Sequence, residues 1–450
     1  MAEALSELLE RQKAYFDAGH TLDVSQRLIA LQALRDAICQ REEVLMEAFA
    51  DDLGKPEVEA YMAELVFTLQ ELDFTSKRLR YWCRPQRVGT PWYFLPARSW
   101  VERRPFGRVL LFGPWNYPFQ LVMAPLISAV AAGNTVVVKP SEHTPATARV
   151  IGEIVEAVFD PSHVSVLHGG GELAEDLLGQ DYEMVFFTGS TGVGRKVALA
   201  AASKLVPSVL ELGGKCPCYV GRDADVEIAA ERILLGKFMN AGQTCVAPDY
   251  VAVHKDVSAA FTEALRGKMR SGIEGWEEMA KLVHMAHYDR LLDLCDGQEV
   301  EVYGIDRPAE NWMAPRIVLE AKLDSALMRE EIFGPILPIV TFEDLGELPR
   351  QEGALACYIF SRDASFVRAV QRHTPSGGTC INDIMKHMTN LRLPFGGVGA
   401  SGHGRYRGKW GFEAFTAAHA VTKRYFIPDP LALFPPYEGA YARLKRIFKL

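Results

Sequence analysis

The sequence predicts an α/β fold built on doubly wound parallel sheets. From residue 108 to about residue 410, short apolar runs rich in β-branched residues alternate with helical stretches. Strands covered by helices on both faces read as continuous apolar runs, and their alternation with helices is typical of parallel sheets. With 450 residues the chain exceeds the usual size of one hydrophobic core, so two or three domains are expected.

The first eighty residues are predicted to form several helices. Apolar residues recur there at spacings of three and four, as on one face of a helix: Leu28, Leu31, Leu34 and Ile38, then Met62, Leu65, Leu69 and Leu72. Between about residues 82 and 104 this period is lost, and aromatic residues, proline and arginine take its place. That stretch is predicted to be an extended arm or hairpin.

The strands of the predicted sheets follow this arm. Apolar runs cover residues 109–112, 135–138, 164–167 and 184–187, and further strands are expected at 251–253 and 337–340. Helices are predicted at 120–132, at 144–159 and in a long stretch that ends at Leu205. Near the C-terminus the helical pattern is interrupted by prolines, which exclude one continuous helix: Pro428, Pro430, Pro435 and Pro436.

The composition excludes several classes of protein. Hydrophobic residues make up 48% and charged residues 24%, which is ordinary for a soluble globular chain. The formal charge of −8 gives no attraction to nucleic acid, so no nucleic-acid partner is expected. The N-terminus becomes charged at once, and no apolar run reaches about eighteen residues, so neither a signal peptide nor a transmembrane anchor is expected.

The eight cysteines indicate reduced thiols and a cytoplasmic protein. They are few for a chain of this length, unlike the dense disulfide framework of short secreted domains. Cys216 and Cys218 are separated by one residue, and no matching pair lies elsewhere at the spacing of zinc ligands. No metal site is therefore predicted.

A cysteine and a carboxylate are the first candidates for chemistry. Cys245 ends the segment 240–245, thirty-four positions after Glu211, which begins the segment 211–215. A thiol is a strong nucleophile only as the thiolate, and a nearby base is one way to form it. The pair indicates covalent catalysis. The alternative is that Cys245 is buried and inert, as many cysteines are, and seven other cysteines compete for the role.

Glycines and polar side chains near the predicted strand ends suggest a phosphate-containing ligand. Residues 188–194 follow a strand and open a helix, with glycine at 189, 192 and 194 rather than at the G-x-G-x-x-G spacing. A turn into a packed helix is the equal alternative. Lys139 and Glu142 follow the strand at 135–138 and can supply a cation and a hydroxyl acceptor, or form a surface turn. Asn116 follows the first strand and can donate to an oxyanion, with a simple turn asparagine as the alternative.

In combination, these segments resemble those of the NAD(P)-dependent aldehyde dehydrogenases. The resemblance extends from about residue 10 to residue 425, and seven blocks occur in the order of that family. They are Pro-Trp-Asn116-Tyr-Pro, Lys139-Pro-Ser-Glu142, Phe187-Thr-Gly189-Ser, Glu211-Leu-Gly-Gly-Lys215, Gly242-Gln-Thr-Cys245, Glu330-Glu331-Ile-Phe333-Gly-Pro335 and Pro394-Phe-Gly-Gly-Val-Gly399. Residues 116–119, and 382–383 ahead of 393–395, look like the class 3 branch, which includes fatty and aromatic aldehyde dehydrogenases.

The resemblance implies two Rossmann-type α/β domains and a small β oligomerisation arm. An NAD(P)-binding domain is expected at residues 1–81 and 105–209, and a catalytic domain at 210–412. The arm would comprise 82–104 and 413–432, followed by a tail at 433–450. A homodimer is expected. Within the tail, one apolar face among arginines and lysines is expected to pack in the dimer rather than cover a substrate entrance or touch a membrane: Tyr441, Leu444, Ile447 and Phe448.

The same resemblance implies roles in catalysis. Cys245 would attack the aldehyde carbon to form a thiohemiacetal, and Asn116 with the Cys245 amide would hold the oxyanion. After hydride transfer, Glu211 would activate water, and also the thiol, so that the thioester is hydrolysed to the acid. Because the CoA-acylating relatives lack this base, Glu211 favours hydrolysis.

The cofactor and substrate contacts are likewise implied by the resemblance. Glu142 would bond a free ribose 2′-hydroxyl and repel a 2′-phosphate, so NAD is expected first, with NADP as the alternative because Lys139 softens that repulsion. The expected cofactor-binding residues are Lys139, Glu142, Gly189, Ser190, Gly194, Leu212, Gly213, Glu331 and Phe333. Medium- or long-chain aliphatic or aromatic aldehydes are expected in a channel near Tyr117, Met239, His387 and His403.

Two other functions compete with an aldehyde dehydrogenase. A thiol esterase or acyl-transfer enzyme would use the same thioester chemistry at Cys245 without oxidation. A protein that has lost catalysis and serves only in binding would be expected to have lost at least one of Asn116, Glu211 and Cys245, and all three are present.

Overall fold

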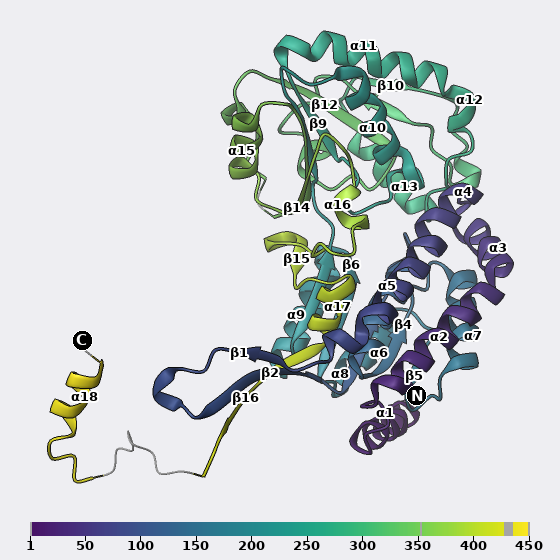
Figure 1. The fold of residues 1–450 in the computed structure, drawn as a ribbon. Helices are drawn as coiled ribbons and strands as arrows, with labels where there is room; N and C mark the ends of the chain where they lie inside the picture. Colours follow the sequence, from purple (N-terminus) through teal and green to yellow (C-terminus); the bar gives the residue numbers. More distant parts are fainter. Residues whose placement is uncertain (1, 352, 427–434, 449–450) are drawn as a thin grey trace. The chain divides into compact units, whose positions relative to one another are not determined.

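The computed structural model of the chain describes residues 2–351, 353–426 and 435–448. These residues divide into two compact units, one formed by Met1–Trp82 with Pro105–Thr416 and the other by Cys83–Arg104 with Ala417–Leu450. Residues 427–434 and 449–450, which belong to the predicted arm and tail and include Pro428 and Pro430, lie outside the described residues. Figure 1 shows the larger unit as sheets surrounded by helices.

The helices predicted before residue 82 are present. They are α1 (Ala2–Asp17), α2 (Val24–Gln40), α3 (Glu42–Leu53), α4 (Glu57–Ala60), a π-helical turn (Tyr61–Val66) and α5 (Phe67–Trp82). In α2, the residues at spacings of three and four, Leu31, Leu34 and Ile38, are completely buried. The apolar period therefore identified the face that packs into the core.

The first sheet has six strands in the order β15-β7-β6-β3-β4-β5. Its strands are β3 (Arg108–Phe112), β4 (Thr135–Lys139), β5 (Val164–Val166), β6 (Met184–Gly189), β7 (Ser208–Leu212) and β15 (Gly402–His403). The helices α6 (Gln120–Ala132), α7 (Pro145–Val158), α8 (Gly171–Gly179) and α9 (Thr191–Ser203) connect them. The chain builds from β3 to β5 on one side and then returns to add β6 and β7 on the other. The crevice between β3 and β6 is the switch point where such sheets bind ligands.

The second sheet has seven strands in the order β10-β11-β12-β9-β8-β13-β14. The strands are β8 (Pro217–Val220), β9 (Tyr250–His254), β10 (Val300–Val302), β11 (Arg316–Val318), β12 (Ile336–Phe342), β13 (Ala354–Phe360) and β14 (Ser376–Ile381). Its helices include α10 (Val226–Phe238), α11 (Lys255–Ser271), α12 (Ile273–Trp276), α13 (Met285–Leu294), α14 (Ala326–Arg329), α15 (Ala364–His373) and α16 (Lys386–Thr389), whereas α17 (Gly408–Ala414) packs against α5 and α6 of the first sheet. Figure 1 shows α10 and α11 next to β9 and β12.

The prediction of parallel sheets is confirmed for their interiors and is incomplete at one edge of each. β15 runs antiparallel to β7, and β10 runs antiparallel to β11. Both edge strands are short, with two and three residues. An antiparallel edge strand does not need a crossover helix. The continuous apolar run that marks a buried parallel strand, with helices before and after it, is therefore missing from these segments.

The most apolar stretch of the sequence forms a buried helix. All thirteen residues of α6 are buried. The helix packs against β3, β4 and α5, which is consistent with the prediction for residues 120–132. In the described part of the chain, no helix combines the length and the apolar character needed to cross a membrane.

The smaller unit contains a three-stranded sheet and a short helix. Strands β1 (Gln86–Val88) and β2 (Ala97–Pro105) form an antiparallel pair, with β16 (Thr416–Arg424) on the other side of β2. This confirms the extended structure predicted at 82–104. Helix α18 (Ala440–Phe448) begins after the prolines, and the Phe448 ring lies 5.7 Å from that of Trp92 and 5.4 Å from that of Tyr93.

A buried ion pair links the helical segment before residue 82 to the start of α6. Lys55 and Glu64 form a salt bridge, and their side chains are 2% and 0% exposed. The other carboxylate oxygen of Glu64 accepts hydrogen bonds from the backbone amides of Phe119 and Gln120, at 3.2 and 2.9 Å. A carboxylate at this position satisfies amide groups that a helix start leaves without partners. Glu64 therefore fixes the turn 113–119 between β3 and α6.

We predict that removing one member of this pair destabilises the protein. Lys55→Met leaves the Glu64 carboxylate buried without its cation, a loss of typically about 3–5 kcal/mol. Urea unfolding should show this loss as a lower midpoint. The double variant Lys55→Met with Glu64→Leu should be less destabilised than the sum of the two single changes. An unchanged midpoint in Lys55→Met would contradict the prediction.

Candidate active site

Two cavities in the larger unit meet at Cys245. One, of about 570 Å³, is lined by strand ends of the first sheet, and the other, of about 380 Å³, is lined mainly by apolar side chains. Cys245 and Leu121 line both. A nucleophile at this junction can reach ligands that enter from either side.

The larger cavity lies at the carboxyl ends of the parallel strands. Its walls include residues from the ends of β3, β4, β6 and β7, or from the turns that follow them: Phe112, Gly113, Asn116, Lys139, Glu142, Thr188, Gly189, Ser190, Glu211, Leu212 and Gly213. Most of the residues predicted from separate segments are thus brought together, because parallel strands present their carboxyl ends at one edge.

The glycine-containing turn after β6 leads directly into a helix. Ser190 is the N-cap of α9, and its side chain accepts a hydrogen bond from the Val193 amide at 3.4 Å. At Gly194, a Cβ would lie 2.4 Å from the Leu212 side chain, so a larger residue would push α9 away from β7. The N-terminus of α9 therefore lies close to the cavity, where its amides and dipole favour a phosphate.

Lys139 and Glu142 form an ion pair on the wall of this cavity. The Lys139 Nζ lies 2.8 Å from the Glu142 carboxylate, which is 41% exposed. Partial burial acts to raise the pKa of Glu142, but the hydrogen bond from Lys139 and a backbone amide outweigh it, so the net pKa is lowered. The carboxylate is therefore ionised at neutral pH and can accept hydrogen bonds from a ribose hydroxyl.

Glu331 approaches the backbone after β7 closely. Its carboxylate accepts a hydrogen bond from the Gly214 amide at 3.0 Å, and a Cβ at Gly213 would lie 1.9 Å from it. Burial, and next the nearby Asp249, raise the pKa of Glu331 to about 8. Phe333 lines the same cavity, and its ring lies 5.4 Å from that of Trp115.

The segment before Cys245 has a strained backbone. Asn240, Ala241 and Gly242 all have positive φ, at 53°, 53° and 75°. A Cβ at Gly242 would lie 2.2 Å from the Gly334 carbonyl oxygen, so only glycine fits there. The Gln243 side chain donates to the Asn240 and Lys281 carbonyls and accepts from the Val283 amide. These bonds hold a conformation that non-glycine residues rarely adopt, as is common at functional sites.

The Cys245 thiol is neutral at rest. Burial, with the Glu331 and Glu211 carboxylates, raises its pKa to about 12, and Arg407 acts in the opposite direction. Thiolate formation therefore needs a base at the moment of reaction.

Glu211 is a buried carboxyl group without a hydrogen-bond partner. It lies near the end of β7, is 3% exposed, and neither of its oxygens has a partner among the described residues. Burial raises its pKa well above the ordinary value, while Arg405 and Arg407 act to lower it. An orphan carboxyl facing a cavity is destabilising unless a ligand or water completes its hydrogen bonds, and its raised pKa makes the carboxylate form a stronger base than an ordinary glutamate.

The Asn116 side chain is 4% exposed and lines the larger cavity with Cys245. It donates one hydrogen bond to the Gln243 carbonyl at 3.0 Å, and its backbone carbonyl accepts from the Asn240 side chain at 2.9 Å. A side-chain amide has two N–H groups, so one remains available. The same contacts connect the turn after β3 to the loop that bears Cys245.

The smaller cavity has the character of an apolar channel. Of the four predicted channel residues, Tyr117 and Met239 line it, and the Tyr117 hydroxyl bonds Thr244 at 2.7 Å. Its apolar walls come from the π-helical turn, α5, α6 and the segment around α16: Met62, Val66, Phe67, Leu121, Ile384, Met388 and Phe395.

His387 and His403 are not among the described residues that line this cavity. The His387 ring packs under α16, where a Cβ at Gly378 would lie 2.5 Å from it, and it contacts the Tyr358 ring at 6.1 Å. His403 is exposed on β15, and its Nε2 bonds the Ser208 hydroxyl at 2.9 Å. Their place in the predicted channel is therefore corrected: each ring faces a strand rather than the cavity.

Arg407 was not identified from the sequence. It is 1% exposed, lines the apolar cavity with Cys245, and its guanidinium lies over the rings of Phe67 and Tyr406 at 4.4 and 4.8 Å. Arg407 is 162 residues from Cys245 and lies in none of the recognised motifs, so the sequence gives no sign that the two residues are close. It provides positive charge next to two groups whose anionic forms burial disfavours.

Comparison with known proteins assigns the chain to a family. The family model described as "Aldehyde dehydrogenase family" matches residues 2–421. The chain is 41% identical over 447 residues to the 4,4'-diaponeurosporen-aldehyde dehydrogenase of Staphylococcus aureus, covering 97% of each chain. It is 36% identical over 450 residues to the dimeric NADP-preferring aldehyde dehydrogenase of Canis lupus familiaris, covering 98% of this chain and 99% of the relative.

The chain belongs to the aldehyde dehydrogenase family. A solved structure described as the substrate-bound state of Staphylococcus aureus AldH matches with a TM-score of 0.95 at 40% identity, covering 99% of both chains. A PnpE structure in complex with nicotinamide adenine dinucleotide matches with a TM-score of 0.85 at 27% identity, covering 95% of this chain and 91% of that one. The class 3 likeness is supported by several family 3 relatives.

Membership establishes the general reaction. The protein is an oxidoreductase that oxidises aldehydes to carboxylic acids with NAD or NADP. The site fits such a cofactor. The helix start at Ser190, the Lys139–Glu142 pair, and the close contact between Glu331 and the Gly213 backbone lie on one cavity of suitable size.

Proposed function

We propose that Cys245 is the nucleophile of this aldehyde dehydrogenase and Glu211 its general base. The observation behind this proposal is the position of Cys245 at the junction of the two cavities, with the unpartnered carboxyl of Glu211 on the wall of one of them. Glu211 accepts the thiol proton, and the thiolate adds to the aldehyde carbon. The free N–H of Asn116 and the Cys245 amide then donate to the new oxyanion.

The second half of the reaction releases the acid. Bound NAD or NADP supplies the acceptor for the hydride that leaves the thiohemiacetal. The acyl group then remains on Cys245 as a thioester. Glu211 first releases the thiol proton to solvent and then removes a proton from water, and the resulting hydroxide adds to the thioester carbonyl. The carboxylic acid leaves as the Cys245 thiolate is released, and the proton on Glu211 returns to that thiolate. Arg405 and Arg407 keep Glu211 able to ionise in spite of its burial.

We predict separate effects for the two residues. Cys245→Ala should abolish NADH formation, whereas Glu211→Gln should slow turnover by about 10²–10⁴-fold, which is typical of losing a general base. Because burial raises the pKa of Glu211, its basic form is populated only as the pH rises. Deacylation in the native enzyme should therefore accelerate from pH 6 to pH 9, and Glu211→Gln should lose this dependence.

Stopped-flow measurement of NADH with decanal, in a burst and a steady-state phase, tests these effects. Ser203→Ala, a change on the exposed end of α9, serves as the control. Substantial NADH formation by Cys245→Ala would show that another group is the nucleophile.

The preferred aldehydes are proposed to be apolar, aliphatic or aromatic, and of medium or long chain. The cavity on that side of Cys245 is lined mainly by methionine, leucine, valine, isoleucine and phenylalanine. Burial of each methylene group against such walls stabilises the bound aldehyde by about 0.8 kcal/mol. We likewise propose that residues 1–81 and 105–209 bind the cofactor. Residues 210–412 are proposed to carry the catalytic cysteine.

NAD is the proposed first cofactor. The Glu142 carboxylate is ionised next to Lys139, so it can bond a 2′-hydroxyl and repels a 2′-phosphate. We predict that Glu142→Ala lowers the ratio of kcat/KM for NAD to that for NADP by about tenfold, because a hydrogen bond to a charged group is worth roughly 1.5–3 kcal/mol. Glu175→Ala, an exposed change on α8, is the control. An unchanged ratio in Glu142→Ala would contradict this role.

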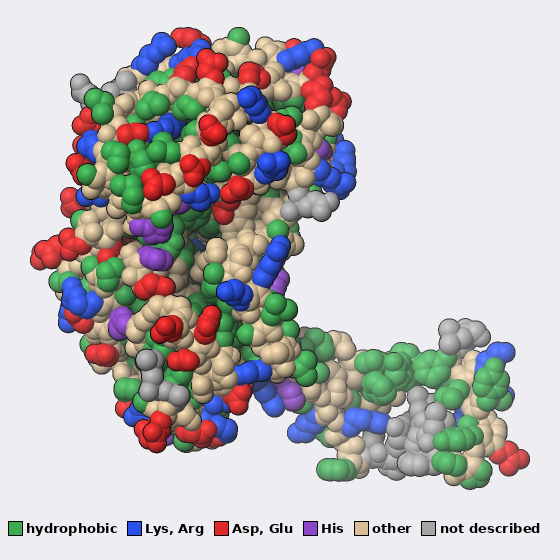
Figure 2. Space-filling view, turned by 180° about the vertical axis from the view of Figure 1, so that it is seen from behind, with side chains coloured by type: hydrophobic (Ala, Val, Ile, Leu, Met, Phe, Trp, Pro, Cys, Tyr) green, Lys and Arg blue, Asp and Glu red, His purple; other side chains and the backbone are tan. Residues whose placement is uncertain are grey.

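A homodimer in the cytoplasm is the proposed working form, and its support is the distribution of charge. The smaller unit contains eleven lysines and arginines against three aspartates and glutamates, whereas the rest of the chain contains 38 against 54. Figure 2 shows this unit largely in green and blue and the larger unit with many red groups. Its β16 edge is exposed, as is that of β1, and such edges tend to pair. The arm and tail of one copy would dock on an acidic surface of a second. Among the described residues, none of the eight cysteines forms a disulfide.

We predict that this dimer weakens with salt. Sedimentation velocity at 50 and 500 mM NaCl should show more monomer at the higher concentration, because exposed charges are screened within a few ångströms there. Arg87→Glu with Lys423→Glu, both exposed on the arm, should favour the monomer, and Arg11→Glu on α1 should not. A monomer at low salt would contradict the dimer.

A further inference from the structure

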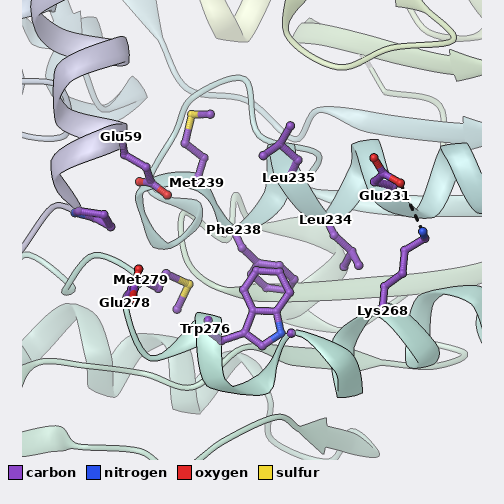
Figure 3. A pocket seen from close by; sticks show the side chains of 13 residues that line it. Glu59, Glu231, Leu234, Leu235, Phe238, Met239, Lys268, Trp276, Glu278 and Met279 are labelled. Carbon is purple, nitrogen blue, oxygen red and sulfur yellow. Dashed lines mark hydrogen bonds and ion pairs between the residues drawn. The ribbon is translucent and has the colours of Figure 1, made fainter.

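A further hollow, called here the second hollow, lies on the other side of α10 from the smaller, apolar cavity next to Cys245. That smaller cavity is the proposed aldehyde cavity. The second hollow has a volume of about 460 Å³, within the range of small-molecule sites. Figure 3 shows the rings of Phe238 and Trp276 at its centre, with Leu234 and Met279 next to them. Phe238, Leu234 and Met279 are almost completely buried, and the two rings lie 5.2 Å apart. The floor of the hollow is therefore apolar and well packed.

The two hollows share a wall. Leu235 and Met239, on and just after α10, line both the aldehyde cavity and this second hollow. Leu235 is 63% exposed although it is apolar. The exposed apolar surface of Leu235 is removed from water only when a ligand covers it, and that removal is favourable.

The size of the aldehyde cavity decides where a long chain must go. A methylene group is close in size to a water molecule, whose share of liquid volume is about 30 Å³, so the cavity accommodates about a dozen such groups. An aldehyde longer than this, with its carbonyl at Cys245, extends beyond the cavity. The next apolar surface that shares walls with the cavity is the second hollow.

The rim of the second hollow selects against an anionic end. Glu59, Glu231 and Glu278 line it, and among the described residues Glu231 alone of the three pairs with a cation there, Lys268 at 3.4 Å. A carboxylate or phosphate at the far end of the ligand would meet like charges. An uncharged hydrocarbon end does not.

We propose that this hollow is a distal subsite for the uncharged far end of long-chain aldehydes, which pass over Leu235 and Met239 from Cys245. The inference rests on the proposed apolar substrate class. It predicts that the subsite contributes to the binding of long aldehydes and has no effect on the binding of short ones.

Gly275 offers a way to fill the hollow. It lines the hollow on α12, is exposed, and a Cβ there would meet nothing within 4 Å. Gly267 on α11 is the matched control, because it is also an exposed helical glycine with open space around a Cβ but does not line the hollow. Gly275→Trp and Gly267→Trp introduce the same side chain, and Gly275→Ala leaves the hollow open.

The test compares kcat/KM for octanal and hexadecanal. Gly275→Trp should lower the value for hexadecanal about tenfold, as expected from the loss of roughly two buried methylene groups, and leave octanal within about twofold. Gly275→Ala and Gly267→Trp should leave both unchanged. An unchanged value for hexadecanal in Gly275→Trp, or an equal fall for both aldehydes, would overturn the subsite.

Calorimetric binding of hexadecanol, which has no aldehyde, separates this proposal from the proposed function. Gly275→Trp should weaken hexadecanol about tenfold relative to Gly267→Trp, and equal affinities would overturn the subsite. If the native enzyme formed no NADH from either aldehyde, the substrate class would fail, and hexadecanol binding would still decide the subsite.

Discussion

The left-handed backbone at Asn240, Ala241 and Gly242 is the constraint on which the site depends. These residues turn the chain so that Cys245 reaches the junction of two cavities. Non-glycine residues in this region cost of order 1–3 kcal/mol each, so the surroundings must hold them. The bonds of the Gln243 side chain and the contacts between Asn116 and residues 240–243 provide that support. The side chains of Asn116 and Cys245, the proposed oxyanion donor and nucleophile, are thereby held on segments that are fixed to one another.

Burial then sets the chemistry of the groups that this loop brings together. It raises the pKa of Cys245 to about 12, that of Glu331 to about 8, and that of Glu211 well above normal. When the Glu211 carboxylate takes the thiol proton, one negative charge moves between the two groups and no second isolated charge is created. Arg407 lowers the cost of the negative charge from a position in the apolar cavity. The Cys245 thiol therefore becomes reactive toward the aldehyde only when its proton is transferred to a base.

The sequence predicted the parts of the fold that follow a local rule. The buried runs that became β3, β4, β5 and β6 could be read directly, because a strand covered on both faces is apolar throughout. The edge strands β10 and β15 could not be read, since two or three residues leave no period. Residues of six of the seven ordered blocks line the larger cavity.

The remaining site residues depend on tertiary structure. Arg407 and Glu64 act through contacts with residues more than fifty positions away, which no local spacing reports. His387 and His403 are the opposite case. Each lies close in sequence to the block at 394–399, but its ring faces a neighbouring strand. The direction of the side chain, rather than the residue type, decides which of these residues contact the site.

Intact-mass measurement of the Glu211→Gln enzyme gives the most direct test of the central claim that Cys245 holds the acyl group while Glu211 releases it. The enzyme is mixed with decanal and NAD and quenched in acid within the first turnover. The account predicts a mass increase of one decanoyl group, located on Cys245 by peptide mapping and absent from the double variant Cys245→Ala with Glu211→Gln. NADH formation without an adduct, or an adduct on another residue, would contradict it.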